Sequence, residues 1–525
     1  MFPFLDEFRA RLDGQVESVT HPNGTEVYVQ LRGADLQGAV STLKNDYSGR
    51  VVTIFAEDRR AAENCFLIHC VMDFPGYPEF LILSSRVAAE DPHFRSLSAE
   101  FPALNWQERE MQDWFGIKLD GHPNPRRVAL HDNWPAVNPL RKDFSVDTIL
   151  PPFEGERHIY RPAVGEGVFQ VPVGPVHAGI IEPGHFSFAV AGEPILYLQL
   201  RMFYTHKGTE KLFEGLPIPK AVFLAESISG DSSFSHGTAF CQAVERACEI
   251  EVPTLALRMR CVLLEMERIY NHIADVGAIA TDVGFVIANS HAGRLRERML
   301  ALNEQMTGNR LLRGMVCIGG VRRKWHASQA TLWSKSIREI EAEFRLLVSL
   351  IHSSDSTRDR LETTGFLSPD KAQDLGIVGV GGRASGIARD VRRDHPYAAY
   401  SQFEIKVPCY EAGDVWHRMQ VRIDEVYESV RIILEALGDE NHGEINSPLR
   451  ELPAGRCALA AVEGWRGEII HWIRTGPNNS LERCKIKDPS LNNWPAVVEA
   501  VQGNIIADFP VINKSFNLSY SGTDR

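Results

Sequence analysis

Apolar runs with strand character dominate the first 144 residues of the chain. The segments EVYVQL (26–31), RVVTIFAE (50–57), CFLIHCVMDF (65–74) and PEFLILSSRV (78–87) are rich in β-branched and aromatic residues, which favours strands. The stretch from Ser96 to Ile117 then has helical periodicity, and we expect Pro102 to bend or break it. These patterns predict a small α+β domain over residues 1–144.

The pattern changes after residue 144. Residues 145–165 are rich in Pro and Gly and lack sustained periodicity, so they predict a linker. From residue 166 a short β-like entry gives way to the i, i+3, i+4 apolar spacing of helices, over 238–252, 254–280, 328–354 and 416–438. We therefore expect a mostly helical second domain over 166–525 and assign the chain to the α+β class.

Composition and charge narrow the functional classes. The 525 residues carry 56 Lys and Arg against 68 Asp and Glu, and this net charge of −12 argues against a general nucleic-acid grip. No run approaches the roughly 20 apolar residues of a membrane-spanning helix, so work at a membrane would need a membrane-embedded partner. The nine cysteines are scattered with no two three positions apart, which argues against a zinc ribbon or an iron–sulfur binding run and favours reduced thiols in a cytosolic compartment.

Three short segments carry residues capable of chemistry. The segment 174–186 places His177 and His185 on a turn shaped by Gly and Pro, where a pocket or structural role competes with metal binding. The segment 204–211 offers Glu210, which is either an exposed helix residue or a buried acid with a raised pKa that could relay protons. The segment GVGGRASG (379–386) lacks the spacing of a phosphate loop but presents Arg383 on a permissive backbone.

The segment ESISGDSSFSH (226–236) has the form of a site but unsuitable ligands. Small residues form a tight turn that also holds Asp231 and His236, just before the start of a helix. Neutral serine hydroxyls are poor metal ligands, and without an adjacent base they are poor nucleophiles. Neither a Ser–His–Asp hydrolase context nor a dinucleotide-binding fingerprint accompanies the turn.

Long, ordered motifs resemble a known family. The segments Glu108–Glu110, Asp113–Leu130 and Asn138–Phe144 resemble the C subunit of bacterial respiratory complex I. The segments around His177 and Glu210, with 383–397 and 487–524, resemble the D subunit of complex I and, more closely, the large subunit of group 4 energy-converting nickel–iron hydrogenases. The fused C–D order also matches the large subunits of formate hydrogenlyase-type hydrogenases.

The departures from this family concern its metal ligands. The resemblance implies two Cys-x-x-Cys pairs, and these fall on Ser229 and Ser232 and on Ser519 and Gly522. Because nickel and low-spin iron need soft thiolates, we expect no nickel–iron centre and no cofactor held by this chain. The chain also ends at Arg525, the position where nickel-containing members usually lose a C-terminal extension, which agrees with that expectation.

Other parts of the family's site are retained. The resemblance implies that Glu210 stands where the family passes protons from the metal, that Arg383 is the arginine overhanging the site, and that His177, His185 and His236 also match. Asp524 is expected to line the same pocket. Ser229 and Ser232 would then line a vacated or repurposed pocket in which Asp231 and His236 could still move a proton.

The resemblance implies a peripheral-arm subunit of a membrane-bound, redox-driven complex, with NADH:quinone oxidoreductase-like electron transfer coupled to ion or proton movement. The expected partners are an iron–sulfur small subunit like the B subunit of complex I, carrying a 4Fe-4S cluster, and membrane subunits like the H subunit of complex I and cation/proton antiporters. The chain would lie in the cytoplasm against the inner face of the cell membrane. Quinone could bind at the subunit interface, although no counterpart of the family's quinone-contacting tyrosine stands in FLAESISG and NAD binding would rest on the family alone.

Two alternatives stay open. One is a non-catalytic scaffold that docks the iron–sulfur subunit onto the membrane subunits. The other is an active hydrogenase with unusual ligands.

Overall fold

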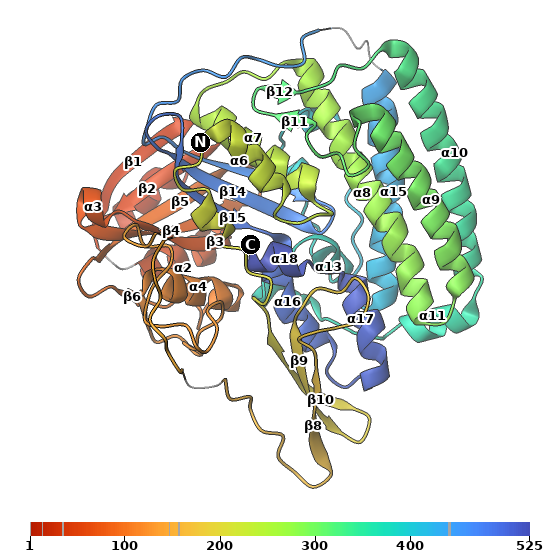
Figure 1. Cartoon of the computed structure of the whole chain (residues 1–525), viewed down its shortest axis with the longest axis horizontal. Helices are drawn as coiled ribbons and strands as arrows, with labels where there is room; N and C mark the ends of the chain where they lie inside the picture. The colour runs from red at the N-terminus through yellow and green to blue at the C-terminus, as the bar shows by residue number, and fades with distance from the viewer. Residues whose placement is uncertain (1, 13, 34–35, 146, 156–157, 439–442) are drawn as a thin grey trace.

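The computed structural model describes residues 2–12, 14–33, 36–145, 147–155, 158–438 and 443–525. The first domain forms a sheet with strand order β1-β2-β5-β4-β3 (Figure 1). Its strands are β1 (Val16–Asn23), β2 (Glu26–Leu31), β3 (Arg50–Asp58), β4 (Cys65–Phe74) and β5 (Tyr77–Ala88). All of β4 is buried, which explains its continuous apolar sequence. The four predicted strands are confirmed within two residues.

Short helices flank this sheet. They are α1 (Leu5–Arg11), α2 (Leu36–Tyr47), α3 (Arg60–Glu63) and α4 (Asn105–Phe115), with the small parallel pair β6 (His93–Arg95) and β7 (Lys118–Asp120). The predicted break at Pro102 is confirmed, because Pro102–Leu104 form a 3-10 turn and α4 begins after it.

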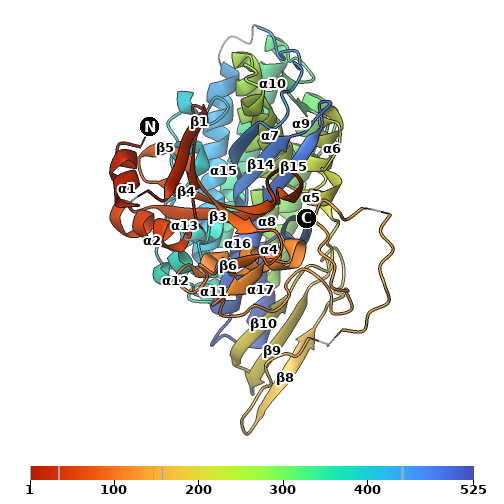
Figure 2. The same ribbon diagram turned by 90° about the vertical axis from the view of Figure 1, so that its left-hand side faces the viewer.

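The β-rich entry of the second part is an antiparallel sheet that projects from the body of the molecule (Figure 2). Its strands are β8 (Val168–Val173), β9 (His185–Ala191) and β10 (Ile195–Arg201). The strand β9 is buried in its middle, whereas Phe169 on β8 and Leu196 on β10 are exposed. The β-like entry predicted from the sequence is therefore confirmed.

Long helices form the opposite side of the molecule (Figure 1). The main ones are α7 (Ser233–Ala247), α8 (Thr254–Asp282), α9 (Val286–Thr307), α10 (Ala327–His352) and α15 (Val415–Gly438). The buried helix α8 lies against both α9 and α15. Shorter helices are α5 (Thr209–Leu212), α6 (Ile218–Glu226), α11 (Asp355–Leu361), α12 (Pro369–Asp374), α13 (Gly379–Ala384) and α14 (Val391–Asp394), with the short hairpin β11 (Val316–Cys317) and β12 (Gly320–Val321).

The sequence patterns missed a second buried sheet near the C-terminus. Its antiparallel strands are β13 (Cys457–Gly464), β14 (Gly467–Thr475) and β15 (Leu481–Lys487). The sheet lies between the first domain and the helices, with β15 against β3 and β13 against α7 (Figure 1). The chain then ends in α16 (Pro489–Ala500), α17 (Phe509–Phe516) and α18 (Tyr520–Asp524).

Buried ion pairs join the first domain to this C-terminal sheet. Glu57 of β3 pairs with Arg474 of β14 at 2.8 Å, and Arg50 pairs with Glu468 at 2.7 Å. Trp472 also donates a hydrogen bond of 2.9 Å to the Tyr28 hydroxyl. The two domains are therefore held together through β14.

No helix in the described ranges has the length and apolar character needed to cross a membrane.

Candidate functional site

The turn between α6 and α7 is fixed by a carboxylate from α8. Glu267 accepts hydrogen bonds from the backbone N–H groups of Phe234, at 2.8 Å, and Ser235, at 3.1 Å. These are donors of the first turn of α7, which the Ser232 side chain does not cap. Burial raises the pKa of Glu267 to about 7. The carboxyl group of Glu267 therefore positions the N-terminus of α7, and with it the predicted site.

The four positions predicted from the resemblance converge. The Ser229 hydroxyl lies 2.9 Å from the Ser519 hydroxyl, although the two residues are 290 positions apart in the chain. The Ser519 oxygen accepts a hydrogen bond of 2.9 Å from the Gly522 N–H, and the Ser232 hydroxyl lies 3.4 Å from an Asp231 oxygen. We call Ser229, Ser232 and Ser519 the hydroxyl cluster. The turn and the C-terminal segment are therefore two halves of one place in the fold.

Asp231 is held by an arginine that the sequence analysis did not single out. Arg466, in the turn between β13 and β14, donates to both Asp231 oxygens, at 2.7 and 2.6 Å, and its guanidinium stacks 3.8 Å from the Trp465 ring centroid. Loss of solvent opposes ionisation of Asp231, but the Arg466 charge outweighs it and lowers the pKa of the carboxyl group. Asp231 is thus a paired carboxylate, and the Ser229 hydroxyl donates to it at 2.9 Å.

His236 lies in a buried row of titratable side chains. Its Nε2 atom is 3.1 Å from an Asp488 oxygen, and its Nδ1 atom is 3.0 Å from Nε2 of His471. Burial works against the charged form of Asp488, but the hydrogen bond with His236 outweighs this and lowers the Asp488 pKa. Burial, with the neighbouring His236, keeps the pKa of His471 well below its usual value. The geometry allows a proton to be held or exchanged between His236 and Asp488.

Gly522 gives Asp488 its room. A Cβ atom at position 522 would lie 2.6 Å from an Asp488 carboxylate oxygen and 2.9 Å from the Ser519 hydroxyl. The carboxylate therefore occupies the space that a side chain at position 522 would need.

The sequence analysis left Glu210 as either an exposed helix residue or a buried acid with a raised pKa. The structure shows that Glu210 is buried, but the prediction of a raised pKa is wrong. Its carboxylate pairs with Arg483 at 2.7 Å and Lys485 at 3.3 Å. Burial would raise the Glu210 pKa, but the positive charges of Lys485, Arg483 and Arg525 outweigh it and lower the pKa. Arg525 and Lys485 also pair with Glu110 of α4. We call Glu210, Glu110, Arg483, Lys485 and Arg525 the Glu210 cluster.

The two predicted histidines of the 174–186 turn have different surroundings. His177 is hydrogen-bonded through Nε2 to the Gly184 carbonyl at 2.7 Å. This turn covers the C-terminal segment, because Tyr520 packs against Gly184 and the Ser521 N–H donates to Glu182 at 2.9 Å. His185 is half-buried, and burial lowers its pKa.

Arg383 and Asp524 lie in structural networks. Arg383 is fully buried and pairs with Glu425 at 2.7 Å and Glu463 at 2.9 Å, so its hydrogen bonds and ion pairs do not reach the hydroxyl cluster. Arg466 is the arginine that contacts the turn. Asp524 accepts backbone hydrogen bonds from Phe203 and Thr205, both at 2.9 Å, and burial raises its pKa to about 6. It anchors α18 to the chain before α5.

Arg466, His471 and Glu267 are the site residues that sequence reasoning missed. Arg466 and His471 belong to GWRGEIIHW, in which charged and polar residues sit among strand-forming apolar ones, and Glu267 is an acid inside the apolar run of α8. Asp488 fell inside a motif that carried the resemblance but was not singled out. Charged or polar residues inside an otherwise apolar strand or helix are the sequence signal that could have identified these site residues.

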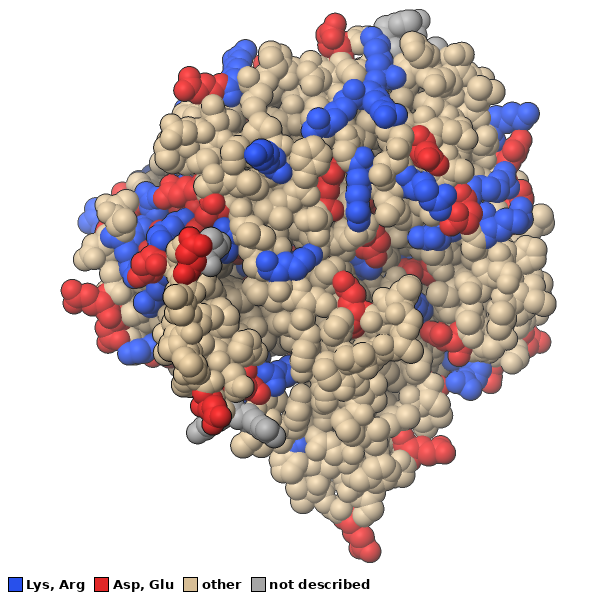
Figure 3. Space-filling model, viewed as in Figure 1, with Lys and Arg blue, Asp and Glu red and all other residues tan. Residues whose placement is uncertain are grey.

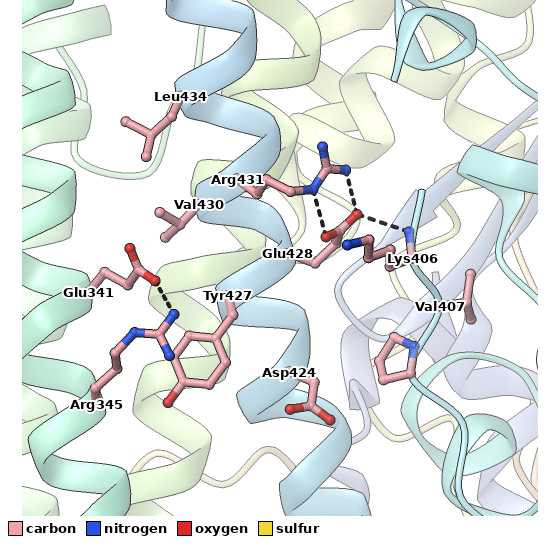
Figure 4. Close-up of a pocket in the computed structure, with 11 residues that line it drawn as sticks. Glu341, Arg345, Lys406, Val407, Asp424, Tyr427, Glu428, Val430, Arg431 and Leu434 are labelled. Carbon is pink, nitrogen blue, oxygen red and sulfur yellow. Dashed lines mark hydrogen bonds and ion pairs between the residues drawn. The ribbon is translucent and has the colours of Figure 1, made fainter. Parts of the chain in front are cut away.

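Away from the hydroxyl cluster, a groove of about 600 Å³ lies between α10, α15 and residues 406–408 (Figure 4). Two ion pairs lie within the groove, Arg345 with Glu341 at 2.5 Å and Arg431 with Glu428 at 2.7 Å. The predicted site residues do not line it.

Comparison with known proteins identifies the family of both domains. Residues 29–149 match the model for the respiratory-chain NADH dehydrogenase 30 Kd subunit, and residues 282–454 and 440–525 match that for the 49 Kd subunit. Formate hydrogenlyase subunit 5 of Escherichia coli is 33% identical over 93% of this chain and 87% of its own length. Hydrogenase-4 component G of the same organism is 31% identical over 99% and 92%.

A solved structure agrees on the fold. A chain of the membrane-bound sulfane sulfur reductase, described as an archaeal respiratory membrane complex, superposes with a TM-score of 0.65. It covers 69% of this chain and all of its own length, at 24% identity. Taken with the two relatives, these matches show that the chain belongs to the family shared by group 4 hydrogenase large subunits and the fused C and D subunits of respiratory complex I.

Proposed function

We propose that the chain is a peripheral-arm subunit of a membrane-bound, redox-driven complex related to complex I and group 4 hydrogenases. The observation that carries this proposal is the 33% identity to formate hydrogenlyase subunit 5, which extends over 93% of the chain and spans both fused domains. Its proposed partners are a small subunit with a 4Fe-4S cluster and membrane subunits like the H subunit of complex I and cation/proton antiporters. The chain would then sit on the cytoplasmic face of the cell membrane through these partners.

We further propose that this chain holds no nickel–iron centre. Positions 229, 232 and 519 offer neutral hydroxyls and position 522 offers no side chain, whereas nickel in such a centre needs thiolates. A Cβ atom at position 522 would lie only 2.6 Å from the Asp488 carboxylate, so a cysteine there would require a shift of one of the two. Within the described ranges, no group of three or more His, Cys, Asp or Glu residues is arranged to hold a metal ion.

In this proposal the chain's own residues handle protons and hydrogen bonds. Asp231, fixed by Arg466, accepts the Ser229 hydroxyl hydrogen, which leaves the Ser229 oxygen free to accept a hydrogen bond from Ser519. His236 and Asp488 can hold or exchange one proton next to that hydroxyl pair. A quinone bound where this chain meets the iron–sulfur subunit would take two electrons in turn from the partner's cluster and two protons, one of them from this row and the other from solvent. Coupling of that step to ion movement would follow from the membrane subunits.

The second candidate is a scaffold without redox chemistry of its own. The observation that favours it is the pairing of the acids. Asp231 is bound by Arg466 and Glu210 by Arg483 and Lys485, as in a structural network.

One experiment separates these proposals. The intact complex is purified, its nickel content is measured, and its turnover with quinone and with soluble acceptors is compared for wild type, Asp231→Asn and His236→Gln. The exposed residue His291 on α9 supplies the control, His291→Gln. We expect less than about one nickel in ten complexes, and turnover at least roughly tenfold lower in the two site variants at normal subunit content.

Each other outcome has a definite meaning. Stoichiometric nickel would restore the active hydrogenase as the explanation. Unchanged turnover in both site variants would favour the scaffold. A chain that purifies from membranes without any other subunit would overturn the proposed function itself.

A further inference from the structure

An acid-free stretch interrupts an otherwise acidic chain. Between Glu304 and Glu339 there is no Asp or Glu, although the whole chain has a net charge of −12. The same stretch contains Arg310, Arg313, Arg322, Arg323, Lys324, Lys335 and Arg338. It includes the β11–β12 hairpin and the loops around it, which lie beside α6.

Part of this stretch and two lysines from other elements form one exposed surface. Its members are Lys207, Lys220, Arg313, Arg322, Arg323 and Lys324, which we call the basic patch. The Arg322 guanidinium lies 5.3 Å from the ring centroid of Phe223, and this ring is itself 53% exposed. Lys220 is three residues before Phe223 on α6. Figure 3 shows the Lys and Arg side chains gathered over α6 and the β11–β12 region.

The cations of the basic patch outnumber the acids beside them in the described part of the chain. None of its six cations has an ion-pair partner among the residues that the structure describes. The neighbouring cations differ, since Arg310 pairs with Glu297 and Arg298 with Glu343. Glu226, the acid beside the patch, is buried and accepts the Gly314 N–H at 2.9 Å, and its charge acts on Arg322 and Arg313 without ion-pair contact. Uncompensated cations on one face create a positive potential that attracts an oppositely charged partner.

The basic patch borders the candidate site. The Lys207 ammonium donates to the carbonyl oxygens of Ser227, at 3.0 Å, and Ile228, at 2.8 Å. Arg313 donates to the Ser233 hydroxyl at 3.1 Å. The outer side of the turn is therefore cationic, while its inner side holds the hydroxyl cluster.

We propose that the basic patch docks an acidic surface of a partner protein, which closes over the 227–233 turn. This inference rests on the proposed function, because an electron-carrying partner must approach the site. An exposed aromatic ring stacked with an arginine, surrounded by further cations, has the composition of a protein interface with an anchoring centre. Partner carboxylates would pair with the lysines and arginines, and Phe223 would be covered.

Charge reversal and crosslinking in the intact complex test this docking. Carbodiimide treatment joins a lysine amine to a carboxylate in direct contact, so mass spectrometry should find Lys220 or Lys324 joined to an Asp or Glu of another subunit. The double variant Lys220→Glu/Arg322→Glu should retain about tenfold less partner at about 0.15 M salt. The control is Lys335→Glu, an exposed cation of the same stretch on α10, which should retain its partner. Lys220→Gln/Arg322→Gln, which removes charge without reversing it, should give an intermediate loss.

The contrary outcomes are separable. An intact complex that the double reversal leaves unchanged would overturn the docking inference while the proposed function stands. Loss of binding to phosphatidylglycerol vesicles, with the partner subunit retained, would assign the patch to a lipid surface and overturn it as well. Isolation of the chain without any partner would instead contradict the proposed function.

Discussion

The Glu210 cluster and the hydroxyl cluster are both buried near the C-terminal segment, yet they are built from opposite chemistry. In the Glu210 cluster, two carboxylates meet three cations, and every charge has a partner within 4 Å. In the hydroxyl cluster, neutral groups meet at 2.9 Å, and the charged groups beside them are the Asp231–Arg466 pair and the Asp488 carboxylate. Buried charges are costly unless they are paired, whereas buried hydroxyls need one hydrogen bond each. Substitutions in the charged Glu210 cluster should therefore destabilise the fold strongly. Substitutions in the neutral hydroxyl cluster should be tolerated better.

The largest expected effect comes from breaking the charged frame. Glu210→Leu removes the carboxylate that Arg483 pairs with and leaves Lys485 and Arg525 to share Glu110, so we expect the free energy of unfolding to fall by about 3–5 kcal/mol. Urea titration followed by tryptophan fluorescence measures it. The control Glu362→Leu, in a surface pair with Arg358, should cost under about 1 kcal/mol. Equal losses in the two variants would show that the buried Glu210 cluster stabilises the fold no more than a surface ion pair does.

The second-largest effect is expected from acid, which should weaken the Glu57–Arg474 ion pair between the first domain and β14. Burial opposes ionisation of Glu57, but hydrogen bonding to His69 and the Arg474 charge lower its pKa from 4.5 to about 2. A lowered folded-state pKa stabilises the fold above pH 4.5, and this contribution is lost as the pH falls from 4.5 to about 2. We expect a loss of about 3 kcal/mol, measured by urea titrations across this range. Glu57→Gln should show a correspondingly flatter acid dependence, and an unchanged dependence would refute the assignment to Glu57.

A side chain at position 522 should cost less. Gly522→Cys places a Cβ atom 2.6 Å from the Asp488 carboxylate, so α18 or Asp488 must shift, at about 1–3 kcal/mol. Gly293→Cys on α9 is the matched control, because a Cβ atom there meets nothing within 4 Å. Thermal unfolding of the two variants gives the comparison. If Gly522→Cys is as stable as the control, Asp488 does not fill that space.

The smallest effect belongs to the hydroxyl pair. Ser229→Ala and Ser519→Ala should each cost about 1 kcal/mol, since each removes one buried hydrogen-bonding group. Their direct contact at 2.9 Å predicts a double-mutant coupling of about 0.5 kcal/mol or more. Strict additivity in the double-mutant cycle would show that the two hydroxyls do not interact.

Local sequence patterns are sufficient to predict the elements whose own residues determine their conformation. The strands at 26–31 and 65–74, and the helix at 416–438, follow from runs whose burial is uniform or periodic. The start of α7 was placed too late, because residues 233–237 are small and polar and are made helical by Glu267 of α8. The contact with Glu267 therefore sets the N-terminal boundary of α7, which the residues of the turn alone do not predict.

The candidate site depended on pairings that no local pattern contains. The resemblance predicts that positions 229 and 519 lie together, and the two hydroxyls are 2.9 Å apart. It also chose Arg383, where the structure has Arg466 against Asp231. Both arginines stand beside glycines, and only the pairing of β13 with β14 turns Arg466 toward the site. A raised pKa at Glu210 was expected because burial was weighed without the three cations that surround it.

The contact between Ser229 and Ser519 also sets an order of events during biosynthesis. At a translation rate of about 5–20 residues per second, the turn is made roughly 15–60 s before its partner, because 290 positions separate them. During that interval the Ser229 hydroxyl has water or Asp231 as its partner, and the space later filled by α18 is open. The inner face of the turn is therefore accessible to other molecules until the segment that contains Ser519 and α18 has been made and folds against it.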